Sequence, residues 1–233
     1  MLHLQVILKI IRNILHKFKT ELLDNGSIFT SEADFKYNLA LKLSKEPEIS
    51  NIVIEFPEKD KYVDLYCEYN KIRYYIELKY KTKKILINKC SQKIELKSHS
   101  AQNDNRYLLY RDIERLESFI ENKDNAVGIS LFLTNDENYW ENNTPKSAIN
   151  FPLCEKKTNL KNFLCEKCKK KKCNDKNRLC YLTRYGQEKK KSLKIKQAYN
   201  CNWTLLGNIK TNDDSKNIAF RYLLIEVKNK YRE

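Results

Sequence analysis

Two acidic residues and a lysine interrupt a regular alternation of large apolar side chains over residues 62–81. Alternate side chains of a strand point to opposite faces of a sheet. Glu77 and Lys79 therefore share a face, and Asp64 belongs to the polar set of the preceding run. Two carboxylates can hold Mg²⁺ together with water and phosphate oxygens, and a lysine beside them can orient an attacking water or help to deprotonate it. The segment favours metal-assisted hydrolysis of a phosphodiester.

The two runs of this segment are expected to form a hairpin that turns at Asn70 and Lys71. A symmetric register about that turn places Asp64 directly opposite Glu77, with Cβ atoms about 5 Å apart, where two like charges destabilise a sheet. A bound Mg²⁺ or Mn²⁺ would reverse that cost. Alternatively, the acids form the solvent face of an edge hairpin. The apolar pairs of this register are Tyr69–Ile72, Cys67–Tyr74, Leu65–Ile76 and Val63–Leu78.

Glutamate and lysine two residues apart are not unique to the hairpin, since the pattern also occurs at 95–97, 155–157, 188–190 and 226–228. The strongest rival is Glu226 with Lys228, which follow an apolar run and have Asp213 or Asp214 upstream. This rival lies close to the end of the sequence, so no further helix and strand could follow it to complete a sheet. We therefore expect the site in the hairpin.

The surrounding segments predict the elements that position the hairpin. Ser31 is the expected N-cap of a helix, with Asp34 three residues later as a partial capping box. Apolar residues at helical spacing predict a second helix over 99–122, and the continuous apolar run at 126–135 indicates a buried strand. This order predicts a mixed α/β domain with a central mixed sheet flanked by helices. Further strands are expected at 49–56, where Pro57 ends the run, at 201–209 and at 219–228.

Residues 1–23 carry apolar side chains at the spacing of an amphipathic helix, and charged residues interrupt them. Neither a signal peptide nor a membrane span is predicted. We expect this helix to pack on the domain, with a membrane-surface helix or an oligomer contact as the alternatives. The 233 residues fit one domain whose core spans about 28–135, with C-terminal strands at about 199–228.

The site residues and the order of elements resemble the PD-(D/E)XK nucleases, the restriction-endonuclease-like superfamily. That family has a helix, a three-stranded meander, a helix and a further strand, with an acid on the second strand and D/E-x-K on the third. Asp64 matches the first acid, and Glu77 with Lys79 matches the D/E-x-K pair. Val63 stands where the nominal motif has proline. The resemblance covers about residues 28–135.

The resemblance implies further site residues. Similar nucleases often carry a glutamate in the first core helix, and Glu32 matches it; it would contact the metal through water or help to bind a second ion. As a bare residue, Glu32 is equally an acid that the helix macrodipole favours. Gln102 and Arg106 begin the second helix, where similar nucleases often contact phosphate, although both could equally be surface polar residues.

The activity that the resemblance implies is Mg²⁺-dependent endonucleolytic hydrolysis of DNA, of a restriction or defence type. A restriction enzyme would have a methyltransferase partner and, for a symmetric double-strand cut, would act as a homodimer. Two other function classes stay open. One is a nucleic-acid-binding module of the same fold that does not cut, and the other is a zinc-stabilised interaction protein.

A lysine-rich stretch at 154–198 lacks periodicity and is expected to be an insertion, and four of its five cysteines form a cluster. Their spacing is C-x2-C-x4-C-x6-C, and four thiolates so close along the chain can surround tetrahedral Zn²⁺. Without a secretion signal, clustered thiols favour a reducing, cytoplasmic compartment and metal binding. Structural zinc is the prediction; an iron–sulfur cluster, as in some relatives of RecB-type exonucleases, and unligated cysteines are the alternatives. The four residues are Cys165, Cys168, Cys173 and Cys180.

The chain is strongly basic, with 45 Lys+Arg against 30 Asp+Glu and a formal net charge of +15. This excess favours a polyanionic partner, and DNA is the one expected. Lysine-rich, glycine-poor residue usage would also arise in an AT-rich genome without selection for DNA binding. The lysine runs at 167–172 and 189–196 would add phosphate contacts that do not depend on sequence and weaken with salt.

Overall fold

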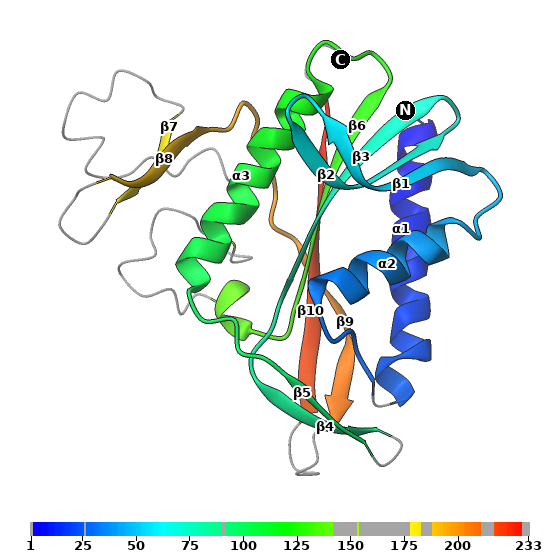
Figure 1. The fold of residues 1–233 in the computed structure, drawn as a ribbon, viewed down its shortest axis with the longest axis vertical. Coiled ribbons are helices and arrows are strands. Elements are labelled where there is room, and N and C mark those ends of the chain that lie inside the picture. The colour runs from blue at the N-terminus through cyan, green and yellow to red at the C-terminus, as the bar shows by residue number, and fades with distance from the viewer. Residues whose placement is uncertain are drawn as a thin grey trace.

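The computed structural model describes residues 2–25, 27–89, 92–141, 153, 178–182, 188–210 and 217–229. Six strands form a central sheet in the order β1-β2-β3-β6-β10-β9. Neighbouring strands are antiparallel except β3 and β6, which are parallel. Helices α1 and α2 cover one face of the sheet and α3 covers the other (Figure 1). The mixed α+β architecture with a central sheet flanked by helices is confirmed.

The helices are α1 (Leu2–Glu21), α2 (Glu32–Leu43) and α3 (Gln102–Ile120), with short 3-10 helices η1 (Leu23–Asn25) and η2 (Glu137–Tyr139). The strands of the central sheet are β1 (Ile49–Glu58), β2 (Lys61–Tyr69), β3 (Ile72–Lys81), β6 (Ala126–Thr134), β9 (Trp203–Lys210) and β10 (Asn217–Val227). Two separate hairpins are formed by β4 (Ile85–Lys89) with β5 (Gln92–Leu96), and by β7 (Arg178–Leu182) with β8 (Glu188–Lys194).

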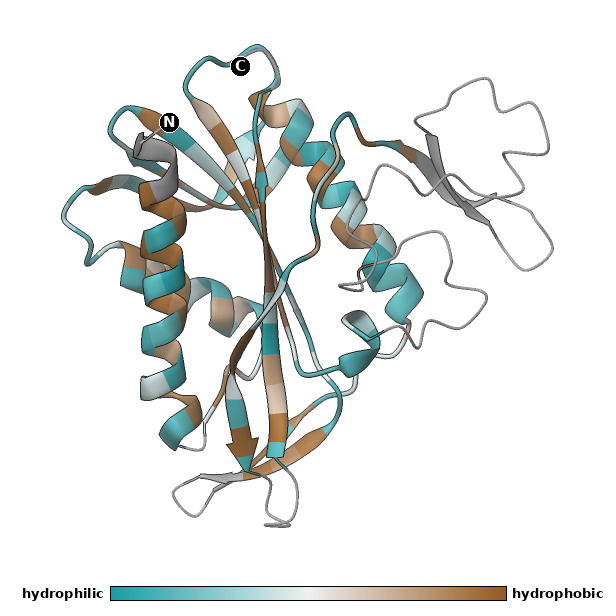
Figure 2. Ribbon diagram, turned by 180° about the vertical axis from the view of Figure 1, so that it is seen from behind, coloured by the Kyte–Doolittle hydropathy of each residue, from teal (hydrophilic) through white to brown (hydrophobic). Residues whose placement is uncertain are grey.

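Helix α1 packs on the sheet, as its apolar stripe predicts. Ile7, Ile11 and Ile14 are fully buried in the cluster that also contains residues of α2 and the strands. Figure 2 shows apolar residues concentrated along the strands and alternating with polar residues on α1. None of the helices in the described residues is long and apolar enough to cross a membrane.

The start of α2 is fixed by its predicted cap. The Ser31 hydroxyl accepts the N–H of Asp34 at 3.0 Å. The Asp34 carboxylate reaches back to the N–H of Thr30 at 2.8 Å, one residue earlier than the usual capping box. Because Glu32 is the first residue of the helix, this cap also sets the position of a predicted site residue.

Strand β1 departs from the prediction that Pro57 ends it. The strand continues to Glu58, and Pro57 pairs with Tyr62. Because β1 lies at the edge of the sheet, it tolerates a residue without an N–H. Asn51 and Glu55 have left-handed backbones, with φ of 52° and 53°, and the register shifts between Ser50 and Val53.

The chain passes from β3 to the parallel strand β6 through the β4–β5 hairpin and α3. This crossover lays α3 over the sheet face that carries Glu77, whose partner in β6 is Ser130. The close approach of α3 depends on Gly128, because a Cβ there would lie 2.9 Å from Leu116 Cβ and 3.0 Å from Val227 Cβ.

Gly128→Ala is expected to destabilise the protein by about 1–3 kcal/mol, because the atoms it would meet are Cβ atoms that move only with the backbone. Gly207→Ala is the matched control, since the atoms its Cβ would meet, Leu23 Cδ1 and Lys19 Cγ and Cδ, can move by side-chain rotation without the backbone. Urea unfolding of both variants measures the difference. Equal losses of stability would show that α3 does not depend on this contact.

Candidate active site

The β2–β3 hairpin forms in the predicted register over five residue pairs, the last of which is Leu65–Ile76. Beyond that pair the strands separate. Val63 lies in the apolar cluster beside α3, whereas Leu78 lies in the cluster on the other face, so the expected pair of these two residues does not form. The cause is Asp64, whose Oδ2 accepts the N–H of Leu78 at 2.8 Å. The Asp64 carboxylate thus lies in the fork between the two strands.

Helix α2 supplies a cation to this fork. Lys36 Nζ is 3.3 Å from Asp64 Oδ1 and forms an ion pair with Glu55 of β1. Burial alone would lower the pKa of Lys36, but the hydrogen bond and charge of Glu55, together with the charge of Asp64, raise the pKa above its ordinary value. Lys36 is therefore protonated. The Asp64 side chain keeps 20% of its surface exposed, so a ligand can reach it from solvent.

Glu77 is almost completely buried, with 1% of its surface exposed. Its Oε2 accepts from Arg115 Nη2, and its Oε1 has no hydrogen-bond partner within the described part of the chain. Burial and the nearby negative charges of Asp112 and Asp64 outweigh Arg115 and raise the pKa of Glu77 to about 9. A buried acceptor without a partner costs about 1–3 kcal/mol, so this oxygen is a natural position for a ligand.

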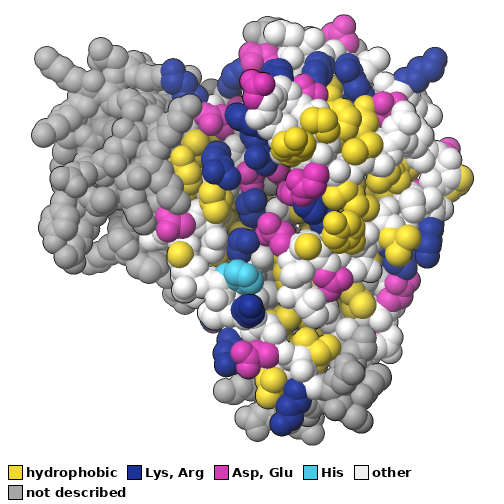
Figure 3. All heavy atoms as spheres, in the orientation of Figure 1, with side chains coloured by type: hydrophobic (Ala, Val, Ile, Leu, Met, Phe, Trp, Pro, Cys, Tyr) yellow, Lys and Arg dark blue, Asp and Glu magenta, His cyan; other side chains and the backbone are white. Residues whose placement is uncertain are grey.

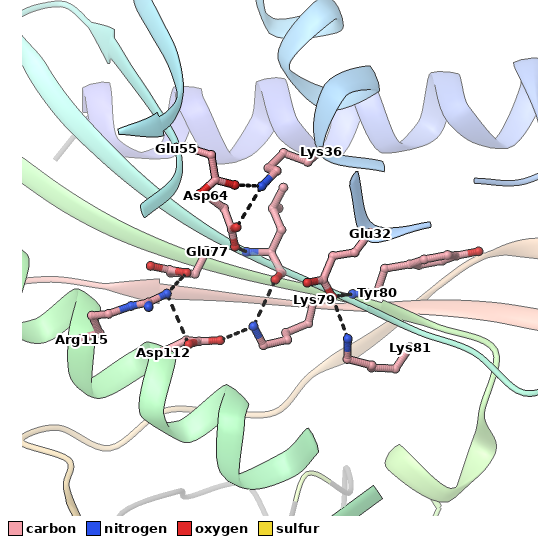
Figure 4. Close-up of polar contacts among 11 residues, drawn as sticks. Glu32, Lys36, Glu55, Asp64, Glu77, Lys79, Tyr80, Lys81, Asp112 and Arg115 are labelled. Carbon is pink, nitrogen blue, oxygen red and sulfur yellow. Dashed lines mark hydrogen bonds and ion pairs between the residues drawn. The ribbon is translucent and has the colours of Figure 1, made fainter. Parts of the chain in front are cut away.

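A buried ionic network joins Glu77 to Lys79 through two residues of α3. Asp112 is fully buried; its Oδ2 lies 2.7 Å from Lys79 Nζ and its Oδ1 lies 3.4 Å from Arg115 Nη2. Figure 4 shows the resulting chain of Glu77, Arg115, Asp112 and Lys79. Burial alone would lower the pKa of Lys79, but Asp112 raises it above its ordinary value. Lys79 is therefore held in its charged form.

Glu32 lies beside the network without joining it. Its Oε2 accepts the N–H of Tyr80 at 2.8 Å and the ammonium of Lys81 at 2.9 Å. The glutamate therefore fastens α2 to β3 just beyond Lys79 (Figure 4). On the surface, Lys and Arg side chains with Asp and Glu among them run between α3 and α2 (Figure 3).

Among the described contacts, Gln102 and Arg106 bind residues other than Asp64 and Glu77. Gln102 Nε2 donates to Asp136 at 3.1 Å, and Arg106 donates to the carbonyl of Asn138. The Arg106 guanidinium also lies 5.6 Å from the centroid of the Tyr139 ring. Both residues thus tie the start of α3 to η2. A phosphate contact by either stays a prediction, and the 2% exposure of Arg106 weighs against both that contact and a surface position.

The residues that sequence reasoning missed are Lys36, Asp112 and Arg115. The sequence could have indicated Asp112, because this acid occupies the apolar stripe of α3 between Leu109 and Leu116. An acid on the buried face of a helix needs a cationic partner. That partner comes from β3, so the pattern of α3 alone could not name it.

The rival pair at the chain end lies apart from this network. Lys228 Nζ is 3.1 Å from Glu226 Oε2. Glu226 pairs with Ile129, which pairs with Ile76, whereas Glu77 belongs to the neighbouring row. Alternation therefore places Glu226 on the face covered by α1 and α2. The upstream residues Asp213 and Asp214 lie outside the described residues.

The cysteine prediction concerns a part of the chain that the structure hardly describes. Cys165, Cys168 and Cys173 lie outside the described residues, and Cys180 falls in β7. Zinc, or an iron–sulfur cluster, stays a prediction. Among the described residues, no group of three or more His, Cys, Asp or Glu side chains is arranged to hold a metal ion. The hairpin site offers two carboxylates, from Asp64 and Glu77.

Comparison of the chain with protein-family models, with curated proteins and with solved structures found no match. The function must therefore be argued from the residues of the site.

Proposed function

We propose that this chain is a metal-dependent deoxyribonuclease with a restriction-endonuclease-like fold, which hydrolyses DNA phosphodiester bonds. The observation that carries the proposal is the fork between β2 and β3, which brings Asp64, the buried Glu77 and the charged Lys79 together. The order α2, three-stranded meander, α3 and parallel strand β6 supports the same family resemblance. A homodimer and a methyltransferase partner belong to the restriction form of this proposal.

The two carboxylates fit a divalent cation. Glu77 Oε1 is buried and has no hydrogen-bond partner among the described residues, and the charge of Asp64 is close enough to raise the pKa of Glu77. A cation held by both acids would satisfy the oxygen and remove the repulsion. Carboxylate oxygens suit Mg²⁺ or Mn²⁺. When bound, such an ion lowers the pKa of a bound water and polarises a phosphate oxygen.

Lys79 acts as a cation in this proposal. Asp112 holds the Lys79 ammonium at 2.7 Å and raises its pKa, so the amine is not available as a base at neutral pH. A charged lysine can donate a hydrogen bond that orients the attacking water, and it can stabilise negative charge that develops on phosphate. For Lys79, orientation of the attacking water and charge stabilisation are therefore favoured over deprotonation of that water.

The test is cleavage of supercoiled plasmid DNA with Mg²⁺ or Mn²⁺ and with EDTA. The wild-type protein is expected to cut only with metal. Glu77→Gln and Lys79→Ala are each expected to lower the rate by at least about 10²–10³-fold, the cost of removing one group that stabilises a transition state. The rival Glu-x-Lys pair at the chain end supplies matched controls, and Glu226→Gln and Lys228→Ala should cut like the wild type.

Circular dichroism melts of all five proteins separate lost activity from lost folding. If the folded wild type binds DNA but leaves plasmid, linear duplex and single-stranded substrates intact with every metal, the catalytic proposal is wrong. A nucleic-acid-binding module of the same fold then becomes the better account. Equal losses in the two pairs would show that the hairpin is not the site.

A further inference from the structure

A pocket of about 520 Å³ lies along the polar stripe of α3, next to the candidate active site. Three elements contribute basic side chains to its wall. Lys61 comes from the start of β2, Arg111 and Arg115 come from α3, and Lys194 and Lys196 come from the end of β8 and just after it. Two glutamates also line the pocket, so five positive and two negative side chains leave a formal excess of +3.

The two glutamates are already engaged in holding the wall together. Glu114 accepts the N–H of Lys194 at 2.6 Å, and Glu121 pairs with the Lys196 ammonium at 2.6 Å. The exposed side chains of Lys61 and Arg111 have no hydrogen bond or ion pair with the part of the chain that the structure describes. Unlike the acids, these two cations are available to an anion.

Arg115 connects the pocket to the candidate active site. It lines the pocket, donates from Nη2 to Glu77, and has a buried Nε for which the described ranges of the chain offer no hydrogen-bond partner. A guanidinium that is held in place by carboxylates on one side can still offer its remaining N–H groups to phosphate, whose oxygens match the arginine fork. An anion in the pocket would therefore lie one side chain away from Glu77.

We propose that this pocket binds the backbone phosphate of a nucleotide adjacent to the one that is cleaved, and that Lys61 and Arg111 hold it beside Arg115. The inference rests on the proposed function, because it assumes a nucleic acid strand that passes the hairpin site. The volume is within the range of sites that enclose a nucleotide-sized ligand. Basic residues from α3, β2 and the end of β8 line the same pocket, which suits a phosphate group.

The test compares two double variants that remove the same charge. Lys61→Ala/Arg111→Ala removes one lysine and one arginine from the pocket wall. Lys9→Ala/Arg12→Ala removes one exposed lysine and one exposed arginine from α1. Arg115 is left in place because it holds Glu77. Anisotropy of a labelled 20-base-pair DNA duplex, measured in EDTA between 50 and 200 mM NaCl, gives the affinity and its salt dependence without cleavage.

We expect the pocket variant to bind the duplex about ten-fold more weakly at the lowest salt. Its plot of log affinity against log salt should be shallower by about 0.9, since one phosphate contact is lost and each contributes about 0.9. The α1 variant should bind like the wild type. Equal weakening of both variants, wild-type binding by the pocket variant, or no binding by the wild type would overturn the inference.

Plasmid cleavage measured in parallel distinguishes this inference from the proposed function. If the pocket variant binds and cuts like the wild type while Glu77→Gln does not cut, the pocket assignment fails and the nuclease stands. If only the pocket variant loses DNA binding and no protein cuts under any condition, the pocket stands and hydrolysis fails.

Discussion

Asp112→Asn is expected to cause one of the largest losses of stability available from a single side chain in this protein. The substitution keeps the shape of the residue but removes the anion between Lys79 and Arg115. Removing one partner of a buried ion pair leaves an uncompensated charge and costs about 3–5 kcal/mol. For a chain of this size, that corresponds to a fall of about 6–20 °C in Tm. Thermal unfolding in EDTA measures it.

The same variant allows a second measurement, the pH profile of DNA cleavage. This profile would not change if Asp112 had only a structural role. Without Asp112, burial lowers the pKa of Lys79, because the anion that raises it is gone. Lys79 then loses its proton at lower pH. The alkaline limb of the pH profile for DNA cleavage is therefore expected to shift to lower pH in Asp112→Asn.

Glu121→Gln is the control for this prediction, because it removes a carboxylate from the same helix that pairs with Lys196 at the exposed surface. Exposed ion pairs contribute little to stability, so Tm and the pH profile should hardly change. If Asp112→Asn has the same Tm as Glu121→Gln and keeps the wild-type pH profile, the α3 network neither stabilises the fold nor sets the protonation state of Lys79.

Local patterns predicted much of the fold. The hairpin register, the Ser31 cap, the buried stripe of α1 and the buried strand β6 each follow from a period or a spacing that the residues carry themselves. The prediction failed at Pro57, where only the edge position of β1 shows that a proline fits. A strand's place in the sheet depends on partners that its own pattern does not contain.

The sequence predicted the candidate site as a pair of carboxylates directly opposed in a regular hairpin, and the structure shows a different arrangement. The ladder stops at Leu65–Ile76, because the Asp64 side chain takes the backbone donor of Leu78. No alternation rule can anticipate a side chain that replaces a ladder bond. The partners of Glu77 and Lys79 come from α3, which reaches them through the crossover to β6.

Each acid of the site consequently lies beside a basic side chain of the protein itself. Arg115 offsets Glu77, Asp112 offsets Lys79, and Lys36 offsets Asp64. One oxygen of Glu77 has no hydrogen-bond partner in this arrangement, as far as the structure describes the chain. The balance is incomplete at the atom that a divalent cation would contact, so protons and metal ions should compete for it.

That competition predicts a stability that falls with pH in EDTA and is nearly independent of pH in saturating Mg²⁺, as far as Glu77 contributes. In EDTA, the pKa of Glu77 is raised to about 9 in the folded protein, from 4.5 for an ordinary glutamate. Between these values the folded state binds more protons than the unfolded state, so stability falls as pH rises. The slope contributed by Glu77 is about 1.4 kcal/mol for each pH unit inside this window. Below pH 4.5 the contribution is constant.

Mg²⁺ should cancel this trend, because it binds the ionised carboxylate and releases the proton. The stabilisation by saturating Mg²⁺ is therefore expected to grow from pH 6 to pH 9 in the wild type, by an amount set by the ratio of metal concentration to its Kd. Glu77→Gln cannot titrate and lacks one of the two carboxylates. Chemical unfolding of this variant should show a flatter pH dependence in EDTA and little response to Mg²⁺. If the wild type and Glu77→Gln had the same pH dependence of stability in EDTA and the same stabilisation by Mg²⁺, Glu77 would be ruled out as the ligand. The metal would then bind elsewhere.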